Sequence, residues 1–95
     1  MKTVVVTRHK ALVEFLINSG KINATDSVIE HATEADIDGK HVIGVLPLSL
    51  AAKALSVTEA TLNLPLELRG KELSLEDVKK CFTGFATYKV IKEEK

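Results

Sequence analysis

The first half of the chain alternates short apolar runs with polar turns. Thr3 to Thr7 is β-branched throughout, which predicts a short strand buried on both faces. Apolar residues at helical spacing within Lys10 to Ser19 predict a helix that stops at Gly20. Two further strands are expected over residues 26–32 and 40–46, with an acidic turn over 33–39 between them.

The second half begins at Pro47, where a first helical turn would begin. Helical spacing then continues through Leu48, Ala51, Ala52 and Leu55. Alternation with polar residues predicts a half-buried strand through Leu62, Leu64, Leu66 and Leu68. Because Pro65 cannot donate a ladder hydrogen bond, this strand lies at an edge of the sheet or ends near Pro65. Ser74 and Asp77 form an approximate capping box for a last helix, whose apolar stripe is Leu75, Val78, Phe82 and Phe85. Residues 88–91 form a final strand or continue that helix.

Alternating strands and helices predict an α/β sandwich with a largely parallel central sheet flanked by helices. We expect one domain over residues 1–91 and a charged, frayed tail over 92–95. In such sheets ligands bind beyond the carboxyl ends of the strands. That rule selects two places, Thr7 to His9 after the first strand and Leu46 to Ser49 after the third.

Composition limits the classes of function. The chain has 95 residues, with 13 Lys and Arg against 13 Asp and Glu, so it suits one small domain that dimerisation would help to stabilise. Its formal net charge of zero argues against a partner that is a long nucleic acid. A single cysteine, Cys81, favours a reducing compartment, and no apolar run is long enough for a membrane span or a signal peptide. We therefore expect a cytoplasmic protein.

Several common site motifs are missing from the sequence. It contains neither the G-x-G-x-x-G dinucleotide fingerprint, nor a P-loop, nor a G-x-S-x-G nucleophile elbow. His9, His31 and His41 do not follow a zinc-ligand spacing, and Cys81 stands alone. We therefore predict no cofactor and no metal.

The segment Thr7-Arg8-His9 is the sharpest candidate for chemistry. It places a hydroxyl, a guanidinium and an imidazole at the start of a helix, where free amides attract anions. Arginine grips phosphate with a planar fork, and histidine can move a proton near neutral pH. The alternative is a solvated turn.

Other candidates each have an ordinary structural alternative. The segment from Pro47 through Leu48 to Ser49 could cradle a phosphate with its free backbone amides and the Ser49 hydroxyl, or could simply start a helix. Gly44 inside a strand indicates close approach by a ligand or by another backbone. His31 could line the same crevice or be a half-exposed strand residue. In the segment before the last helix, Arg69 and Lys71 could add cations, and Glu67 could act as acid or base or pair with Arg69.

Four segments together resemble a known family. They are Thr7-Arg8-His9, His31, the stretch from Ile43 to Ala52 with its Gly-x-Leu-Pro motif, and the stretch from Leu64 to Leu73 with Leu-Pro-x-Glu-x-Arg-Gly-Lys-Glu-Leu. In these the chain resembles, from the first strand to about Val90, the Csx-sixteen family of small accessory proteins found beside type III CRISPR systems. Members often carry Ser where this chain has Thr7, which keeps the hydroxyl.

The resemblance implies a Rossmann-like fold related to CARF domains and the activity of a ring nuclease. Such an enzyme cleaves cyclic oligoadenylate, typically the four-adenylate ring, and so switches off type III CRISPR signalling. We expect metal-independent attack of a ribose 2′-hydroxyl, with Arg8, His9 and Thr7 as catalytic residues. The ligand-binding residues would be Gly44, Pro47, Leu48, Ser49, His31, Glu67 and Arg69, and a C2 homodimer would place the ring on its axis.

Two alternatives belong to other classes of function. The chain could bind cyclic oligoadenylate without cutting it, as a sensor or sponge. It could also be a protein-interaction subunit of a larger CRISPR effector. The charge distribution suits a small anionic ligand, because residues 1–24 carry four cations and one anion while residues 25–38 carry five anions and no cation.

Overall fold

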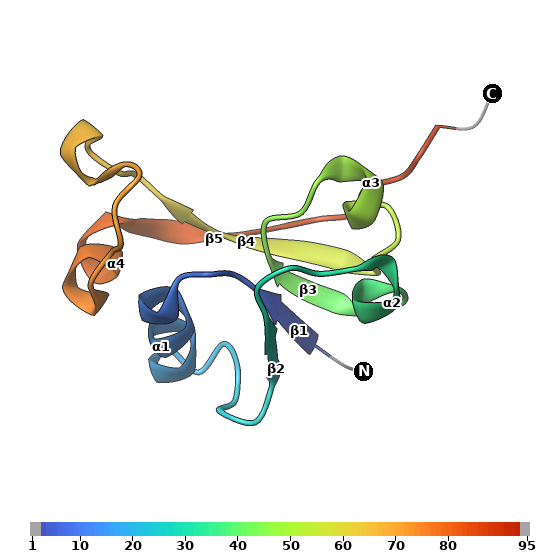
Figure 1. Cartoon of the computed structure of the whole chain (residues 1–95), viewed down its shortest axis with the longest axis horizontal. Coiled ribbons are helices and arrows are strands. Elements are labelled where there is room, and N and C mark those ends of the chain that lie inside the picture. The colour runs from blue at the N-terminus through green and yellow to red at the C-terminus, as the bar shows by residue number, and fades with distance from the viewer. Residues whose placement is uncertain (1–2, 94–95) are drawn as a thin grey trace.

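The computed structural model describes residues 3–93 and gives a small α/β fold (Figure 1). In chain order the elements are β1 (Thr3–Val6), α1 (Lys10–Asn18), β2 (Ser27–Ile29), α2 (Glu34–Ile37), β3 (His41–Gly44), α3 (Leu48–Ala51), β4 (Ser56–Leu62), the 3-10 turn η1 (Leu66–Leu68), α4 (Leu75–Cys81) and β5 (Phe82–Tyr88).

The strands form one five-stranded sheet in the order β2-β1-β3-β4-β5. β1 pairs in parallel with both β2 and β3, and β3 pairs in parallel with β4. Only the last strand, β5, runs antiparallel, along β4. The prediction of a largely parallel sheet is therefore confirmed.

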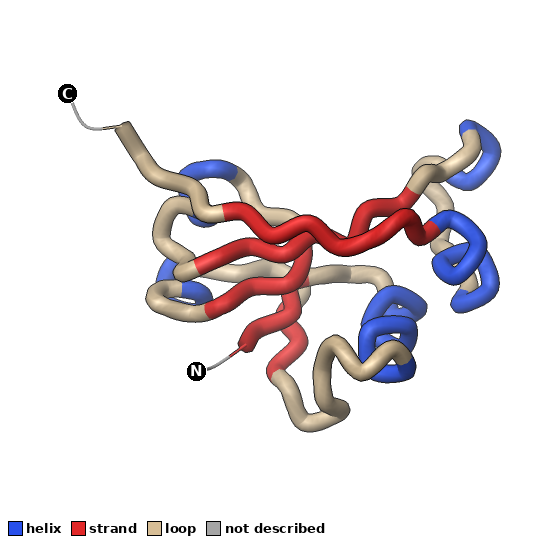
Figure 2. The backbone as a smooth tube through the Cα atoms, turned by 180° about the vertical axis from the view of Figure 1, so that it is seen from behind, coloured by secondary structure: helices blue, strands red, loops and turns tan. Residues whose placement is uncertain are grey.

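The strand order determines which face each helix covers. The connection from β1 to β2 crosses the sheet in one direction, and the next two connections cross it in the other. Because crossovers between parallel strands are right-handed, α1 lies on one face and α2 and α3 lie on the opposite face (Figures 1 and 2). Val5 and Ile43 accordingly pack with Leu16 of α1, whereas Val4 and Val42 pack with Ile37 of α2.

The last helix joins the face covered by α1. Contacts between α1 and α4 hold these two helices together. The Phe15 ring of α1 lies 4.8 Å from the Phe82 ring at the start of β5, and Phe82 lies 4.9 Å from Phe85. This aromatic cluster fixes the end of α1 against the antiparallel end of the sheet.

In the first half of the chain the predicted strands and the first helix are present, but the segment predicted as an acidic turn is partly helical. The first strand is buried on both faces, and α1 ends just before Gly20, which has the positive φ of 78° expected at a helix stop. The next two strands are shorter than predicted, because only residues 27–29 and 41–44 pair with β1. The predicted acidic turn contains the short helix α2, because Thr33 and Asp36 form a capping box and Ile37 is fully buried.

In the second half of the chain, the helices and strands depart further from those that the sequence predicts. The predicted leucine strand is wrong beyond Leu62, which is the last residue of β4. Pro65 is the N-cap of η1, so the strand ends before the proline, as one of the two expectations had it. The helix at Pro47 is present but ends at Ala51, so Leu55 lies beyond it. The capping box of Ser74 and Asp77 is confirmed, but α4 ends at Cys81. Phe82 and Phe85 therefore belong to β5 rather than to a helical stripe, and the strand ends where residues 88–91 were expected to begin one.

No helix within residues 3–93 is long and apolar enough to cross a membrane. In the charged tail predicted over 92–95, residues 92–93 carry no regular structure. Residues 94–95 lie outside the described part of the chain.

Candidate functional site

A groove lies between the start of α1 and the segment that links β4 to α4. Its volume is about 550 Å³, and we refer to it as the edge groove. It is lined by Arg8, His9, Leu12, Leu62, Leu64, Leu68, Gly70, Lys71, Glu72 and Leu73. The groove thus combines a set of leucines with four side chains that can carry charge.

The first wall is built by the turn from β1 into α1. The Thr7 amide donates a hydrogen bond to the Ile29 carbonyl (3.0 Å), so pairing with β2 extends one residue past the strand. The His9 amide donates to the Thr7 hydroxyl (3.1 Å), and His9 is the extended N-cap of α1. The Arg8 and His9 side chains are consequently exposed at the positive end of the helix dipole.

The second wall is built by the turns between β4 and α4. The Asn63 amide donates to the Cys81 carbonyl (2.8 Å), which ties the segment to the end of α4. The Arg69 guanidinium donates through Nε to the Leu64 carbonyl (3.3 Å), across η1. Gly70, at a φ of 77°, then reverses the chain into Lys71 and Glu72, which line the groove opposite Arg8.

The structure therefore brings some predicted site residues together. Arg8 and His9 line the edge groove, and Thr7 joins them in an adjacent hollow of about 320 Å³ beside α1. Glu67 and Arg69 belong to the wall-forming segment but do not line the groove. Lys71 takes the place expected of Arg69, because the Arg69 side chain is bonded back to its own loop.

Other predicted site residues lie elsewhere. Gly44 and Leu48 line a hollow on the opposite face, and Leu48 and Ser49 line a second one there, because the chain after β3 turns toward α3 rather than α1. Pro47 is the N-cap of α3, which has only four residues. His31 is exposed in the bend after β2, and its neighbour Glu30 is the residue that reaches the hollow beside Thr7.

A role for Gly44 is visible in the backbone. Its φ is 142°, and a β-carbon at this position would collide with the carbonyl of Val6 on β1. The sequence left open whether a ligand or another backbone comes close to Gly44. Among the described residues it is the backbone of Val6 that does so. The glycine lets β1 and β3 pair at their carboxyl ends.

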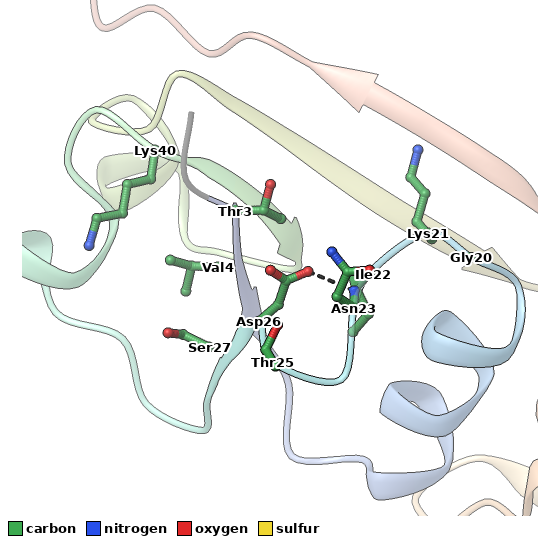
Figure 3. A pocket seen from close by; sticks show the side chains of 10 residues that line it. All are labelled: Thr3, Val4, Gly20, Lys21, Ile22, Asn23, Thr25, Asp26, Ser27 and Lys40. Carbon is green, nitrogen blue, oxygen red and sulfur yellow. Dashed lines mark hydrogen bonds between the residues drawn. The ribbon is translucent and has the colours of Figure 1, made fainter.

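A cavity of about 520 Å³ at the amino ends of the strands offers less convergent chemistry (Figure 3). Lys21 and Lys40 line it, but their side chains point away from each other. The Lys21 ammonium lies 4.8 Å from the centre of the Phe85 ring. The Asp26 carboxylate accepts a hydrogen bond from the Asn23 amide (2.8 Å) within its own turn. Lys21 and Asp26 are thus engaged in contacts within the protein.

Two features of the edge groove escaped sequence reasoning, namely Glu72 and the leucine floor. The alternation of the leucines in this segment predicts one face of a strand instead. Their shared function as a groove lining depends on η1, which turns Leu66 outward and Leu68 inward. Within residues 3–93, no group of three or more His, Cys, Asp or Glu side chains is placed to hold a metal ion.

The chain is similar to a known family of proteins. Over residues 4–91, the chain matches a family described as "Putative CRISPR-associated protein (Cas_VVA1548)". No curated protein and no solved structure matches the chain. The matched range includes both walls of the edge groove and nearly all of the chain, so this protein is a member of that CRISPR-associated family.

Proposed function

We propose that this chain is a ring nuclease of the Csx-sixteen type, with a Rossmann-like, CARF-related fold, that cleaves cyclic oligoadenylate. The observation that carries the proposal is the edge groove, in which Arg8, His9 and Lys71 surround a hollow at the carboxyl edge of the sheet. Membership of a CRISPR-associated family supports the choice of ligand. The four-adenylate ring is the preferred substrate, and its removal ends type III CRISPR signalling in the cytoplasm.

The reaction is an in-line transfer within the substrate. A ribose 2′-oxygen forms a bond to the adjacent phosphorus, and the bond from that phosphorus to the 5′-oxygen of the next nucleotide breaks. The 2′-hydroxyl gives up its proton, and the departing 5′-oxygen gains one. The products carry a 2′,3′-cyclic phosphate and a 5′-hydroxyl, and the step needs positioning and charge stabilisation.

The groove residues suit these needs. Arg8 would hold the phosphoryl oxygens, helped by the amides at the start of α1. His9 would move the proton, since it lines the same groove. The Thr7 hydroxyl already accepts a bond from the His9 amide, so its own hydrogen remains to be donated to phosphate or ribose.

Lys71 adds a second cation to this site. It stands across the groove from the start of α1, where it would contact the phosphodiester from the opposite side. Arg69 would act as a positioning residue, because its bond to the Leu64 carbonyl holds the turn that carries Lys71. A homodimer would let a second copy of the chain cover the part of the ring that one groove leaves exposed.

The test is a single-turnover assay with the chain in excess over cyclic tetra-adenylate, with and without EDTA. We expect linear products ending in a 2′,3′-cyclic phosphate under both conditions. Arg8→Ala should slow cleavage at least tenfold, whereas Lys79→Ala, which removes an exposed cation from α4, should leave the rate unchanged. An intact ring with the unmodified chain would refute the nuclease proposal, and cleavage only without EDTA would refute its metal independence.

A second candidate is a binder that does not cut. It is favoured by the His9 ring, for which no hydrogen-bond partner is found among residues 3–93, so nothing within the described chain orients it as a base. Tight binding of the intact ring without product would select this function. His9→Ala separates the two, because a catalytic histidine affects the cleavage rate much more than the binding constant.

A third candidate is a protein-interaction subunit. The specific observation is that Val45 and Leu48, after β3, are 71% and 75% exposed. A chain that binds no cyclic oligoadenylate but co-purifies with an effector complex in defined stoichiometry would favour it.

A further inference from the structure

We propose that the edge groove recognises a single adenine nucleotide, with the base on the leucine floor, the base amino group on Glu72, and the phosphate between Arg8 and Lys71. The choice of adenine rests on the proposed function, but the binding geometry requires no cleavage.

The floor of the groove is apolar. Leu12 comes from α1, Leu62 ends β4, and Leu64 and Leu68 flank the turn η1. All four are partly exposed, while Leu73 beneath them is 7% exposed and anchors the floor. Apolar surface left in water is unfavourable, so a flat, weakly polar ring gains by covering it.

The rim supplies charge of both signs. Arg8 and Lys71 carry two positive charges against the one negative charge of Glu72, so the rim has a net positive charge that attracts an anion. Glu72 shares the groove with these two cations but forms no ion pair within 4.0 Å among residues 3–93. Its carboxylate therefore stays free to accept hydrogen bonds from a ligand.

These features together fit an adenine nucleotide. The groove volume of about 550 Å³ lies within the roughly 300–1,000 Å³ typical of small-molecule pockets. A carboxylate can only accept hydrogen bonds, so Glu72 would accept one from the amino group at C6 of adenine. In the same orientation it would repel the carbonyl oxygen that hypoxanthine carries at that position. An adenine nucleotide should therefore bind better than its inosine counterpart.

The first experiment compares three probes by NMR titration of the full chain: adenosine 5′-monophosphate, inosine 5′-monophosphate and ribose 5-phosphate. We expect shifts at residues 8–12 and 68–73, and at least tenfold tighter binding of the adenosine compound than of either other probe. Glu72→Gln should reduce the preference over inosine at least fivefold. Glu76→Gln, which changes an exposed carboxylate of α4 outside the groove, should leave this preference unchanged.

The second experiment tests the floor with two leucines of one turn. Leu68 lines the groove, whereas Leu66 in the same 3-10 turn is 81% exposed. Leu68→Asp should weaken adenosine monophosphate binding at least tenfold, and Leu66→Asp should not change it. Circular dichroism of both variants checks that the fold is kept, and the milder Leu68→Ala replaces Leu68→Asp if it is not.

The outcomes separate this inference from ring cleavage. Equal affinity for the adenosine and inosine compounds, or shifts confined to other parts of the chain, would overturn the inference even if the ring is cut. Selective adenosine binding in the groove would uphold it even if the ring stays intact.

Discussion

Replacing Gly44 by alanine tests how closely β1 and β3 approach each other. The new β-carbon would collide with the backbone carbonyl of Val6, and a backbone atom in a central parallel strand cannot swing aside. Gly84→Ala is a matched control. Its φ is also 142°, but nothing lies within 4 Å of the position of its β-carbon.

The comparison of the two variants isolates the collision. In both variants, placing a side chain at such a φ destabilises the folded state by about 1–3 kcal/mol. Both variants also lower the conformational entropy of the unfolded chain by the same amount. In Gly44→Ala the collision with Val6 lowers the free energy of unfolding by about 1–3 kcal/mol more. With about 4–8 °C in Tm per kcal/mol for a domain of this size, Gly44→Ala should melt roughly 5–20 °C below Gly84→Ala.

Urea unfolding followed by far-UV circular dichroism measures the free energies, at one fixed protein concentration so that any association is held constant. A thermal scan gives the Tm of each variant. If the two alanine variants are destabilised equally, within about 0.5 kcal/mol, the collision with Val6 does not determine the choice of glycine at this position.

Three further substitutions test the fold. Leu16→Ala removes a fully buried side chain between α1 and the sheet, and should lower the free energy of unfolding by about 2–5 kcal/mol in urea. Ser74→Ala removes the cap of the Asp77 amide and should cost about 0.5–2 kcal/mol, measured in the same way. Hydrogen bonds from the Thr33 amide and hydroxyl lower the pKa of Asp36 below its ordinary value. The ionised carboxylate therefore stabilises the folded state above the unfolded-state pKa of Asp36, and this contribution is lost as the pH falls through the folded-state pKa. Asp36→Asn should thus have a lower free energy of unfolding than the unmodified chain near neutral pH, and the same one in strong acid. A difference that does not change with pH would contradict the capping role.

The candidate site was only partly predictable. Arg8 and His9 follow a buried strand and precede a helix, a local pattern that marks an anion site at the carboxyl edge of a sheet. Which second segment meets them is not local information. By the same rule the segment after the third strand was as good a candidate for the second wall of the site. The helix that follows this strand lies on the opposite face, however, and the segment after β4 forms the second wall.

The sequence by itself determined the elements that have strong local signals. Val4, Val5 and Val6 specify a strand buried on both faces, Gly20 stops α1, and Ser74 starts α4. These follow from β-branching, from a positive φ and from a capping hydrogen bond, all of which act within a few residues.

Tertiary structure decided what depends on distant partners. Phe82 fits a helical stripe as well as a strand, and it joins β5 because β4 offers backbone hydrogen bonds and Phe15 offers a ring contact. Leu68 and Lys71 became groove residues because Arg69 and Gly70 fold their segment back toward Arg8. Sequence periodicity records which side chains share a face, whereas the neighbour that covers this face is chosen by the packing of the whole chain.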